Sequence, residues 1–195
     1  MTVHPTALVE AGVEIGPGSF IWDNVHIRGP ATTIGTDCII GEKSYIAYGV
    51  TIGDRVKINA FVYICTGVTI QDGVMVSAGA IFTNDRHPRA ATSDLTSLRP
   101  SDPDEDTLAT LVREGATIGA GAIIGPGLEI GRFAMVGMGS VVTHPVPDFA
   151  LVIGNPARRV GSVCRCGQPL GPGVEVTCER CGLGYQVTDG ATRER

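Results

Sequence analysis

Four of the six cysteines lie in two close pairs near the C-terminus of this 195-residue chain. Cys164 and Cys166 stand in the segment VCRCG, and Cys178 and Cys181 stand in the segment CERCG. Thiolate sulfur is a preferred ligand of Zn²⁺, and four thiolates complete a tetrahedral shell without an open catalytic position. A segment this short needs a metal to fold well. The spacing therefore predicts a zinc-ribbon-like module over residues 163–195 with one structural zinc ion.

A second group of reactive side chains begins at Asn84, in the segment IFTNDRHPRA of residues 81–90. A carboxamide such as Asn84 can accept a hydrogen bond from an attacking amine. Asp85 can hold a hydroxyl or an ammonium group, and His87 can act as a general base. Asparagine and aspartate are also common as plain turn residues, so both readings stay open at this point. The other histidines, His4, His26 and His144, are weaker candidates for a base.

The elements that must position these groups follow a six-residue period. A period of six fits neither a helix nor an alternating strand, but it fits a prism in which each short side is one hexad. Three hexads form a coil of 18 residues, and the repeat predicts about six coils. The inward positions are Val3, Val9, Ile15, Ile21, Ile27, Ile34, Ile40, Ile46, Ile52, Ile58, Ile64, Ile70, Val76, Phe82, Ile118, Ile124, Ile130, Val136 and Val142.

The 18-residue coil also predicts which side chains are neighbours. Residues 18 apart share a corner, so Tyr48, Thr66 and Asn84 form one column. The register stops after Asn84, and residues 85–115 are expected to form an extruded loop. A loop of this length in a compact fold is usually functional or disordered. The chain is thus expected to divide into a β-helix over residues 1–162 and the cysteine module over residues 163–195.

Composition narrows the classes of function. The formal net charge is −5, which disfavours nucleic-acid binding through bulk electrostatics. The first residues lack the basic start and apolar run of a signal peptide, and no stretch of 18 apolar residues is present. We therefore expect a cytoplasmic protein without nucleic-acid or membrane partners, in which disulfides are disfavoured.

Hexads of the type Ile-Gly-x-x-Ala/Val-x resemble those of the left-handed β-helix acyltransferases. Three segments sharpen the likeness to nucleotide-sugar N-acetyltransferases that modify 3-amino sugars: IWDNVHI at 21–27, IFTNDRHPRA at 81–90 and GNPARRVG at 154–161. The resemblance covers about residues 1–162. It implies an all-β, left-handed parallel β-helix and a homotrimer with active sites between neighbouring β-helices. It also implies acetyl-CoA as co-substrate and a UDP- or dTDP-linked amino sugar as acceptor.

The same resemblance suggests roles for individual residues. It places Asn84, Asp85 and His87 at the catalytic position; the expected substrate contacts are Tyr48, Thr66, Arg86 and Arg89. A neutral amine is already a good nucleophile, so direct attack on the thioester does not require a dedicated base. Two departures from the family pattern leave the sugar open. Cys65-Thr66-Gly67 stands where an aromatic–acidic pair is expected, and Ser162 stands where the family often has tryptophan.

Coenzyme A is expected along a corner of small residues. Gly119, Gly137 and Asn155 are 18 apart, and Ala120 and Met138 form the adjoining column. Small residues leave room for a thin pantetheine arm, although turn chemistry alone would also explain them. Guanidinium groups suit phosphates. The expected coenzyme A contacts are Gly119, Ala120, Gly137, Met138, Asn155, Arg158 and Arg159.

Three other functions fit the sequence less well than an N-acetyltransferase. A sugar O-acetyltransferase would need a positioned histidine base, and a non-catalytic scaffold would leave the segments at 81–90 and 154–161 without a role. A hexapeptide-repeat carbonic anhydrase would need three histidines with two closely spaced. The spacing of His4, His26, His87 and His144 disfavours it.

Overall fold

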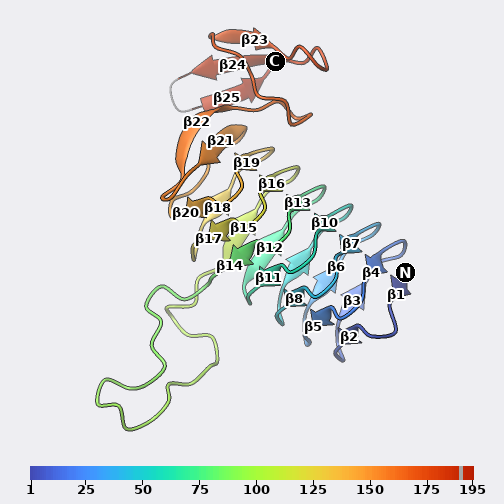
Figure 1. The fold of residues 1–195 in the computed structure, drawn as a ribbon, viewed down its shortest axis with the longest axis vertical. Coiled ribbons are helices and arrows are strands. Elements are labelled where there is room, and N and C mark those ends of the chain that lie inside the picture. The colour runs from blue at the N-terminus through green and yellow to red at the C-terminus, as the bar shows by residue number, and fades with distance from the viewer. Residues whose placement is uncertain (189–190) are drawn as a thin grey trace.

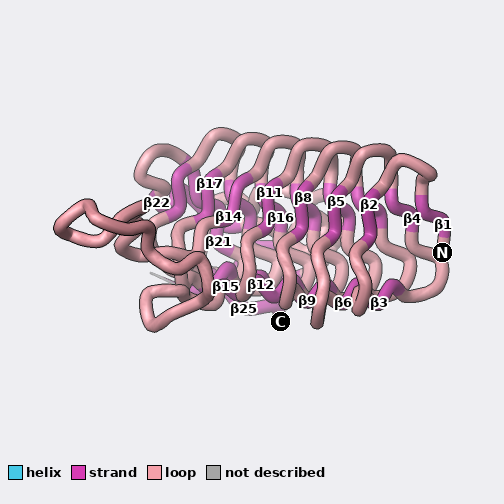
Figure 2. The backbone as a smooth tube through the Cα atoms, turned by 90° about the horizontal axis from the view of Figure 1, so that it is seen from below, coloured by secondary structure: helices cyan, strands magenta, loops and turns pink. Residues whose placement is uncertain are grey.

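The computed structural model describes residues 1–188 and 191–195 as a left-handed parallel β-helix with a small C-terminal sheet. Figure 1 shows the coils stacked from the N-terminus towards the module, with one long loop leaving the stack. Figure 2 shows how each coil bends at its corners between short strands. Within the described residues no helix is present, and hence none that could span a membrane.

Three sheets form the sides of the prism. The first has the order β1 (Thr2–Val3), β4 (Phe20–Ile21), β7 (Ile39–Ile40), β10 (Lys57–Ile58), β13 (Met75–Val76), β16 (Thr117–Ile118), β19 (Met135–Val136), β21 (Ala150–Ile153) and β22 (Arg158–Ser162). The second has the order β2 (Leu8–Val9), β5 (His26–Ile27), β8 (Tyr45–Ile46), β11 (Tyr63–Ile64), β14 (Ile81–Phe82), β17 (Ile123–Ile124) and β20 (Val141–Val142). The third has the order β18 (Glu129–Ile130), β15 (Thr110–Val112), β12 (Val68–Ile70), β9 (Thr51–Ile52), β6 (Thr33–Ile34) and β3 (Glu14–Ile15).

The six-residue period sets the core. In most two-residue strands the second residue points inward, and anchors such as Ile40, Ile58 and Ile64 are fully buried. Small corner residues complete the interior; Ser19 and Cys38 are also fully buried. Each strand pairs in parallel with the strand one coil away, as in Ile58 with Ile40 and Val76. The coils therefore share one continuous core, which no single coil could form alone.

The solenoid is longer than the expected six coils, at about eight turns, and the loop ends earlier than expected. The first sheet alone contains parallel strands from β1 to β21. Val112 is fully buried and pairs with Ile70, so the coil resumes at Thr110 and the loop spans residues 83–109 rather than 85–115. Val112 lies six residues before Ile118, so the hexad period resumes one hexad earlier than expected.

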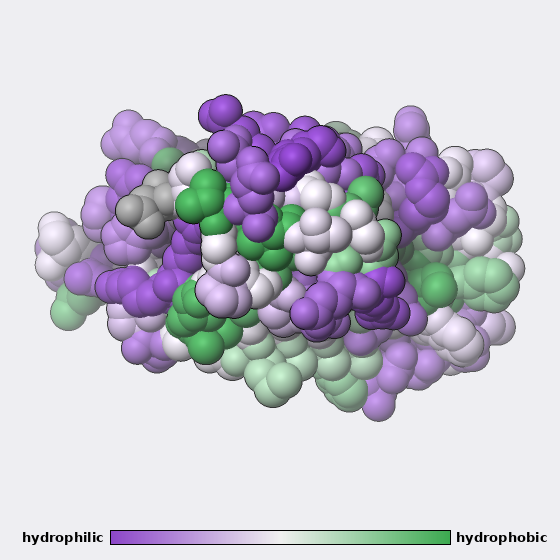
Figure 3. All heavy atoms as spheres, turned by 90° about the horizontal axis from the view of Figure 1, so that it is seen from above, coloured by the Kyte–Doolittle hydropathy of each residue, from purple (hydrophilic) through white to green (hydrophobic). Residues whose placement is uncertain are grey.

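The C-terminal module packs on the end of the β-helix. Strands β21 and β22 form an antiparallel pair, and the module that follows contains β23 (Glu175–Thr177), β24 (Gly184–Thr188) and β25 (Ala191–Glu194). Phe133 and Phe149 stack at the last corners, and Tyr185 meets Phe149 edge-on. Arg165 lies over the ring of Phe133. Figure 3 views this end and shows hydrophobic surface among hydrophilic side chains.

Within one strand, replacing the inward residue by alanine should reduce stability much more than replacing its outward neighbour. Ile52→Ala should lower the free energy of unfolding by about 2–5 kcal/mol, because it opens a cavity in the shared core. Its neighbour Thr51 is exposed, so Thr51→Ala should change the same quantity by less than about 0.5 kcal/mol. Equilibrium unfolding in urea measures both; equal losses would contradict the inward assignment of the hexad anchor.

Candidate active site and metal centre

The predicted column at the second corner, which joins the second sheet to the third, is present in the structure. The hydroxyl of Thr66 donates to the carbonyl of Tyr48 at 2.7 Å, and Nδ2 of Asn84 donates to the carbonyl of Thr66 at 3.2 Å. This bond uses the donor side of the Asn84 amide. Its Oδ1 has no hydrogen-bond partner within residues 1–188 and 191–195, so it can accept a hydrogen bond from a ligand.

The base of the extruded loop is held by polar contacts beside Asn84. The backbone N–H of Leu108 donates to the carbonyl of Asn84 at 2.7 Å, and Asp85 pairs with Thr107. Oδ1 of Asp85 accepts from the backbone N–H of His87 at 2.7 Å, which is the turn-capping role also considered from the sequence. Loop closure therefore fixes Asn84 at the point where the chain leaves and re-enters the coil.

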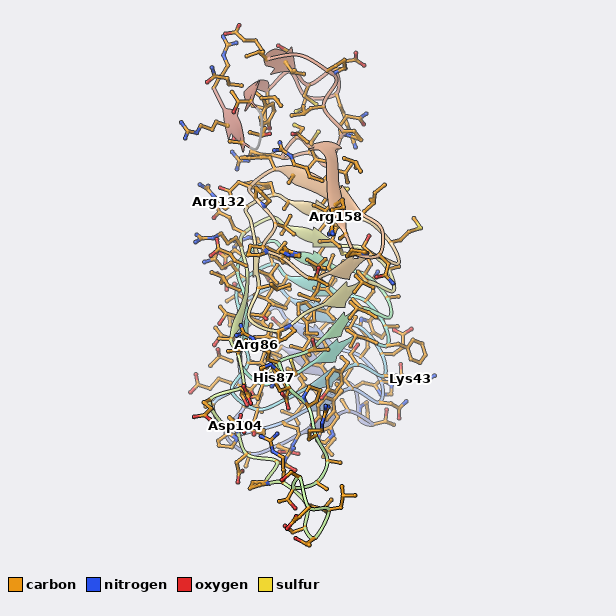
Figure 4. All side chains as sticks on the ribbon, turned by 90° about the vertical axis from the view of Figure 1, so that its left-hand side faces the viewer. Lys43, Arg86, His87, Asp104, Arg132 and Arg158 are labelled. Carbon is orange, nitrogen blue, oxygen red and sulfur yellow. The ribbon has the colours of Figure 1, made fainter. Side chains whose placement is uncertain are left out.

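His87 lies three residues after Asn84 in sequence, and its side chain extends towards solvent. Its Nδ1 is 3.1 Å from Oδ1 of Asp106, and its side chain is exposed. The Asp106 carboxylate can orient the imidazole, as bases are oriented in many hydrolases and transferases. Figure 4 shows Arg86, His87 and Asp104 on the face of the β-helix that carries the loop.

A cavity of about 140 Å³ lies between the column and the loop. Thr66, Asn84 and Asp85 line one side, and Arg89, Arg99, Thr107 and residues 100–104 line the rest. Arg99 pairs with Asp104 at 3.0 Å; neither was among the predicted site residues. Ligand pockets usually have volumes of about 300–1,000 Å³. This cavity can therefore take one end of a substrate but cannot enclose a nucleotide sugar.

A charged cluster of Glu10, His26 and Arg28 beside Tyr48 was not predicted from the sequence. Oε1 of Glu10 lies 2.8 Å from Nε2 of His26 and 3.4 Å from Nε of Arg28, while the Arg28 guanidinium lies over the Tyr48 ring. The hydrogen bond with His26 is the main cause of a lowered pKa of the Glu10 carboxyl. The sequence spacing could have predicted this cluster, because Glu10 and Arg28 are 18 residues apart and therefore occupy adjacent coils.

The predicted coenzyme A residues form two groups. The first lies at the first corner, which joins the first sheet to the second. A Cβ on Gly119 would lie 2.6 Å from the carbonyl carbon of Gly137, so glycine is required there for coils to stack. Nearby, Gly121 and Gly139 have positive φ, and a Cβ there would meet open space, while Met138 is highly exposed. Equivalent corners of earlier coils instead present Lys43 and Phe61. At positions 121 and 139 the later coils thus present no side chain at this corner, which we call the bare corner.

The second group lies at the end of the β-helix. A cavity of about 340 Å³ is bordered by His144, Arg158 and Arg159, together with Val142, Pro145, Val146, Pro147, Val152 and Ala157. Arg158 is exposed and donates to the Ala157 carbonyl at 2.9 Å. Figure 4 shows Arg158 near this end. Asn155 lies in the turn between β21 and β22, which follows the bare corner in the stack.

The four predicted metal ligands meet at one point. Their sulfur atoms all lie within 4.8 Å of one another, with Cys164 to Cys181 at 3.3 Å and Cys166 to Cys178 at 3.6 Å. Four thiolates around one zinc ion at about 2.3 Å would stand about 3.8 Å apart, so the donor set fits zinc. The hydroxyl of Tyr185 lies 3.2 Å from the sulfur of Cys164. A hydroxyl there can donate to a bound thiolate and orient it.

Two family models match the repeats. The bacterial transferase hexapeptide (six repeats) matches residues 49–84, and the hexapeptide repeat of succinyl-transferase matches residues 31–65 and 114–144. The chain therefore carries hexapeptide repeats of the transferase type. Neither match extends into residues 163–195.

Curated relatives share parts of the chain. An 81-residue segment is 48% identical to the dTDP-3-amino-3,6-dideoxy-alpha-D-galactopyranose 3-N-acetyltransferase of Aneurinibacillus thermoaerophilus and covers 42% of each chain. A 49-residue segment is 53% identical to the serine acetyltransferase of Haemophilus influenzae, covering 25% of this chain and 18% of that protein. The matched segments thus span less than half the length of these relatives.

Solved structures share the fold. A variant of AntD, an N-acyltransferase from Bacillus cereus in complex with dTDP and coenzyme A, has a TM-score of 0.66 at 21% identity, over 82% of this chain and 91% of that chain. A second AntD variant, in complex with dTDP-4-amino-4,6-dideoxyglucose and coenzyme A, has a TM-score of 0.63 at 21% identity, over 78% and 84%.

The cysteine geometry predicts one zinc ion per chain in protein purified under reducing conditions. Elemental analysis should find it, and X-ray absorption should give four sulfur neighbours at about 2.3 Å. Cys166→Ser should lower the zinc content, whereas Cys65→Ser, at a buried β-helix position, should not. A zinc-free protein, or a disulfide between these cysteines, would overturn the assignment.

Thiol titration gives an independent check that zinc stabilises only the module. Chelation should expose the four module cysteines to a thiol reagent at neutral pH. Cys38 and Cys65 should stay unreactive, because burial raises the pKa of the Cys38 thiol and raises that of Cys65 to about 11. Reaction of all six would show that metal loss opens the β-helix as well.

Proposed function

We propose that this protein is an N-acetyltransferase that moves an acetyl group from acetyl-CoA to the amine of a UDP- or dTDP-linked 3-amino sugar. The observation that carries the proposal is the placement of Asn84. Its side chain borders a cavity, and its Oδ1 is free to accept a hydrogen bond. Among the described residues, this is the only corner of the β-helix that a long loop interrupts. The acetyltransferase relatives and the shared fold support the class of reaction.

In the proposed reaction the neutral amine attacks the thioester carbonyl directly. A nitrogen–carbon bond forms, the carbon–sulfur bond breaks, and coenzyme A leaves as its thiol after taking up the proton that the amine loses. Oδ1 of Asn84 accepts a hydrogen bond from the amine and directs its lone pair at the carbonyl. At the cavity Asp85 accepts a hydrogen bond from a sugar hydroxyl or the ammonium, and Arg89 binds sugar or phosphate oxygens. Thr66 lines the same cavity, and Tyr48 and Arg86 extend the acceptor site beyond it.

The donor lies along the bare first corner in this proposal. The pantetheine arm follows the column of Gly119, Ala120 and Gly137, and the exposed side chain of Met138 packs along it. The turn with Asn155 continues this path towards the end of the β-helix. Arg158 and Arg159 then face the coenzyme's phosphates with guanidinium groups.

A trimer would complete the site. The second sheet exposes a row of apolar side chains along the β-helix, including Leu8, Tyr63, Ile81 and Ile123. Aligned apolar side chains of this kind mark an interaction surface. The extruded loop adds exposed Leu95 and Leu98. Because the cavity at Asn84 is too small for the whole acceptor, a neighbouring copy is proposed to supply the remaining wall.

A sugar O-acetyltransferase is the second candidate. It is favoured by the His87–Asp106 contact at 3.1 Å and by the short matches to serine acetyltransferases, whose acceptor by name is the amino acid serine. A hydroxyl needs a base to become a good nucleophile. Paired acceptors that differ only in amine or hydroxyl at one carbon separate the two functions. The cytoplasm is the proposed location for either, because reduced cysteines persist there.

Asn84→Ala should lower turnover by about 10- to 1000-fold, which is the range expected when one positioning contact with the reacting group is lost. The fold should survive, since the amide makes one hydrogen bond to a backbone carbonyl. Asn59→Ala provides the matched control at a different corner. Steady-state rates with acetyl-CoA and a nucleotide 3-amino sugar measure both; a change within twofold for Asn84→Ala would reduce Asn84 to a turn residue.

Sedimentation at micromolar concentration should give a trimer of the 20.3 kDa chain. Tyr63→Glu should weaken the assembly, because it places a charge on the apolar row of the second sheet. Thr69→Glu, on the polar third sheet, provides the control. A monomeric wild-type protein with full activity would contradict the shared site.

A further inference from the structure

The side chain of Arg159 bridges the last strand of the first sheet and the cysteine module. Its Nη2 donates to the hydroxyls of Ser162 and Thr192, at 3.0 and 3.1 Å. The two hydroxyl oxygens lie 2.7 Å apart, and both residues are buried. Nε of Arg159 donates to the Gly161 carbonyl at 3.3 Å. Nη1 has no protein partner within the described residues and remains available for a ligand.

The two hydroxyls connect Arg159 to the metal site. Ser162 is the last residue of β22 and precedes Cys164 by two positions. Thr192 lies on β25, which pairs with β24, and Tyr185 of β24 contacts the sulfur of Cys164. The Tyr185 hydroxyl also accepts the backbone N–H of Arg165 at 3.1 Å. The strands that carry Thr192 and Ser162 therefore hold their relative positions only while the module is folded around its cysteines.

Arg158 offers a contrast within the same strand. It borders the same cavity, but among the residues that the structure describes its guanidinium donates only to the Ala157 carbonyl, and its side chain is exposed. Both side chains can face an anion, yet only Arg159 is pre-organised. A long arginine side chain loses conformational freedom when it binds, and contacts that fix it beforehand reduce that cost.

We propose that Thr192, with Ser162, is a positioning residue for coenzyme A. The pair fixes Arg159 at the cavity of about 340 Å³, so that binding of the donor's phosphates depends on the zinc-held module. This inference rests on the proposed acyl-transfer function and gives the module a role in donor affinity. Because the pair acts on binding and lies outside the reacting groups, it changes affinity for the donor and leaves the chemical step unaltered.

Thr192→Val keeps the shape of the side chain and removes its hydroxyl. We expect the Kd for coenzyme A, measured by calorimetry, to rise about 10- to 150-fold, the range for losing a hydrogen bond to a charged group. The KM for acetyl-CoA should rise equally, with kcat within twofold. Thr192→Ser should restore binding to within twofold of wild type. Thr177→Val, on exposed β23 of the same module, is the matched control and should leave both constants unchanged.

A double-mutant cycle separates positioning from general loosening. If Thr192 acts through Arg159, adding Thr192→Val to Arg159→Gln should change the Kd by less than twofold. Removal of zinc should weaken coenzyme A binding to wild type but have little further effect on Arg159→Gln. If Thr192→Val loses zinc, Ser162→Ala replaces it in the cycle.

The outcomes are distinct. If wild type binds coenzyme A and Thr192→Val binds it equally well, the positioning role is wrong and the acyltransferase proposal stands. Additive effects in the cycle also overturn the role, because they show that Thr192 acts independently of Arg159. If wild type shows neither coenzyme A binding nor acetyl transfer, the proposed function itself fails, together with the inference that rests on it.

Discussion

The stacking of β-branched anchors on a single narrow core is the constraint on which the rest of this molecule depends. Anchors such as Ile40, Ile58 and Ile64 have no exposed surface, and each contacts the equivalent residue of neighbouring coils. The anchors and the small corner residues form one continuous, mostly apolar interior. Chemistry is therefore confined to corners, where the chain can vary without disturbing the core.

The three corners of the β-helix differ in their side chains and in their connections. At the second corner the chain leaves the coil for residues 83–109, which places Asn84 beside a cavity. At the first corner the side chains of Lys43 and Phe61 give way to glycine in later coils, and this opens a bare path. At the third corner, Phe133 and Phe149 provide the aromatic surface on which Tyr185 docks. One repeat thus supports the proposed acceptor site, the proposed donor path and a module interface.

Much of this could be predicted from the sequence because the period is strict and local. The anchors, the column of Thr66 and Asn84, and the four metal-ligand candidates follow from spacing alone. The end of the loop could not be placed, because the insertion interrupts the register and one hexad at Val112 does not by itself mark where the register resumes. The contact of Arg159 with Thr192 was also inaccessible, since it joins segments 33 residues apart through tertiary packing of the module. The partners of Asp85 and His87 depend on how the loop closes, which composition does not determine.

Our central proposal is that the corner at Asn84 presents an amine to a thioester. The most direct test is mass spectrometry of the products formed from acetyl-CoA with a dTDP-linked 3-amino sugar and with its 3-hydroxy counterpart. The account predicts one acetyl group on the nitrogen of the amino sugar, released coenzyme A in equal amount, and little product from the hydroxy sugar. Acetylation of the hydroxy sugar alone, or no transfer to either acceptor, would contradict it.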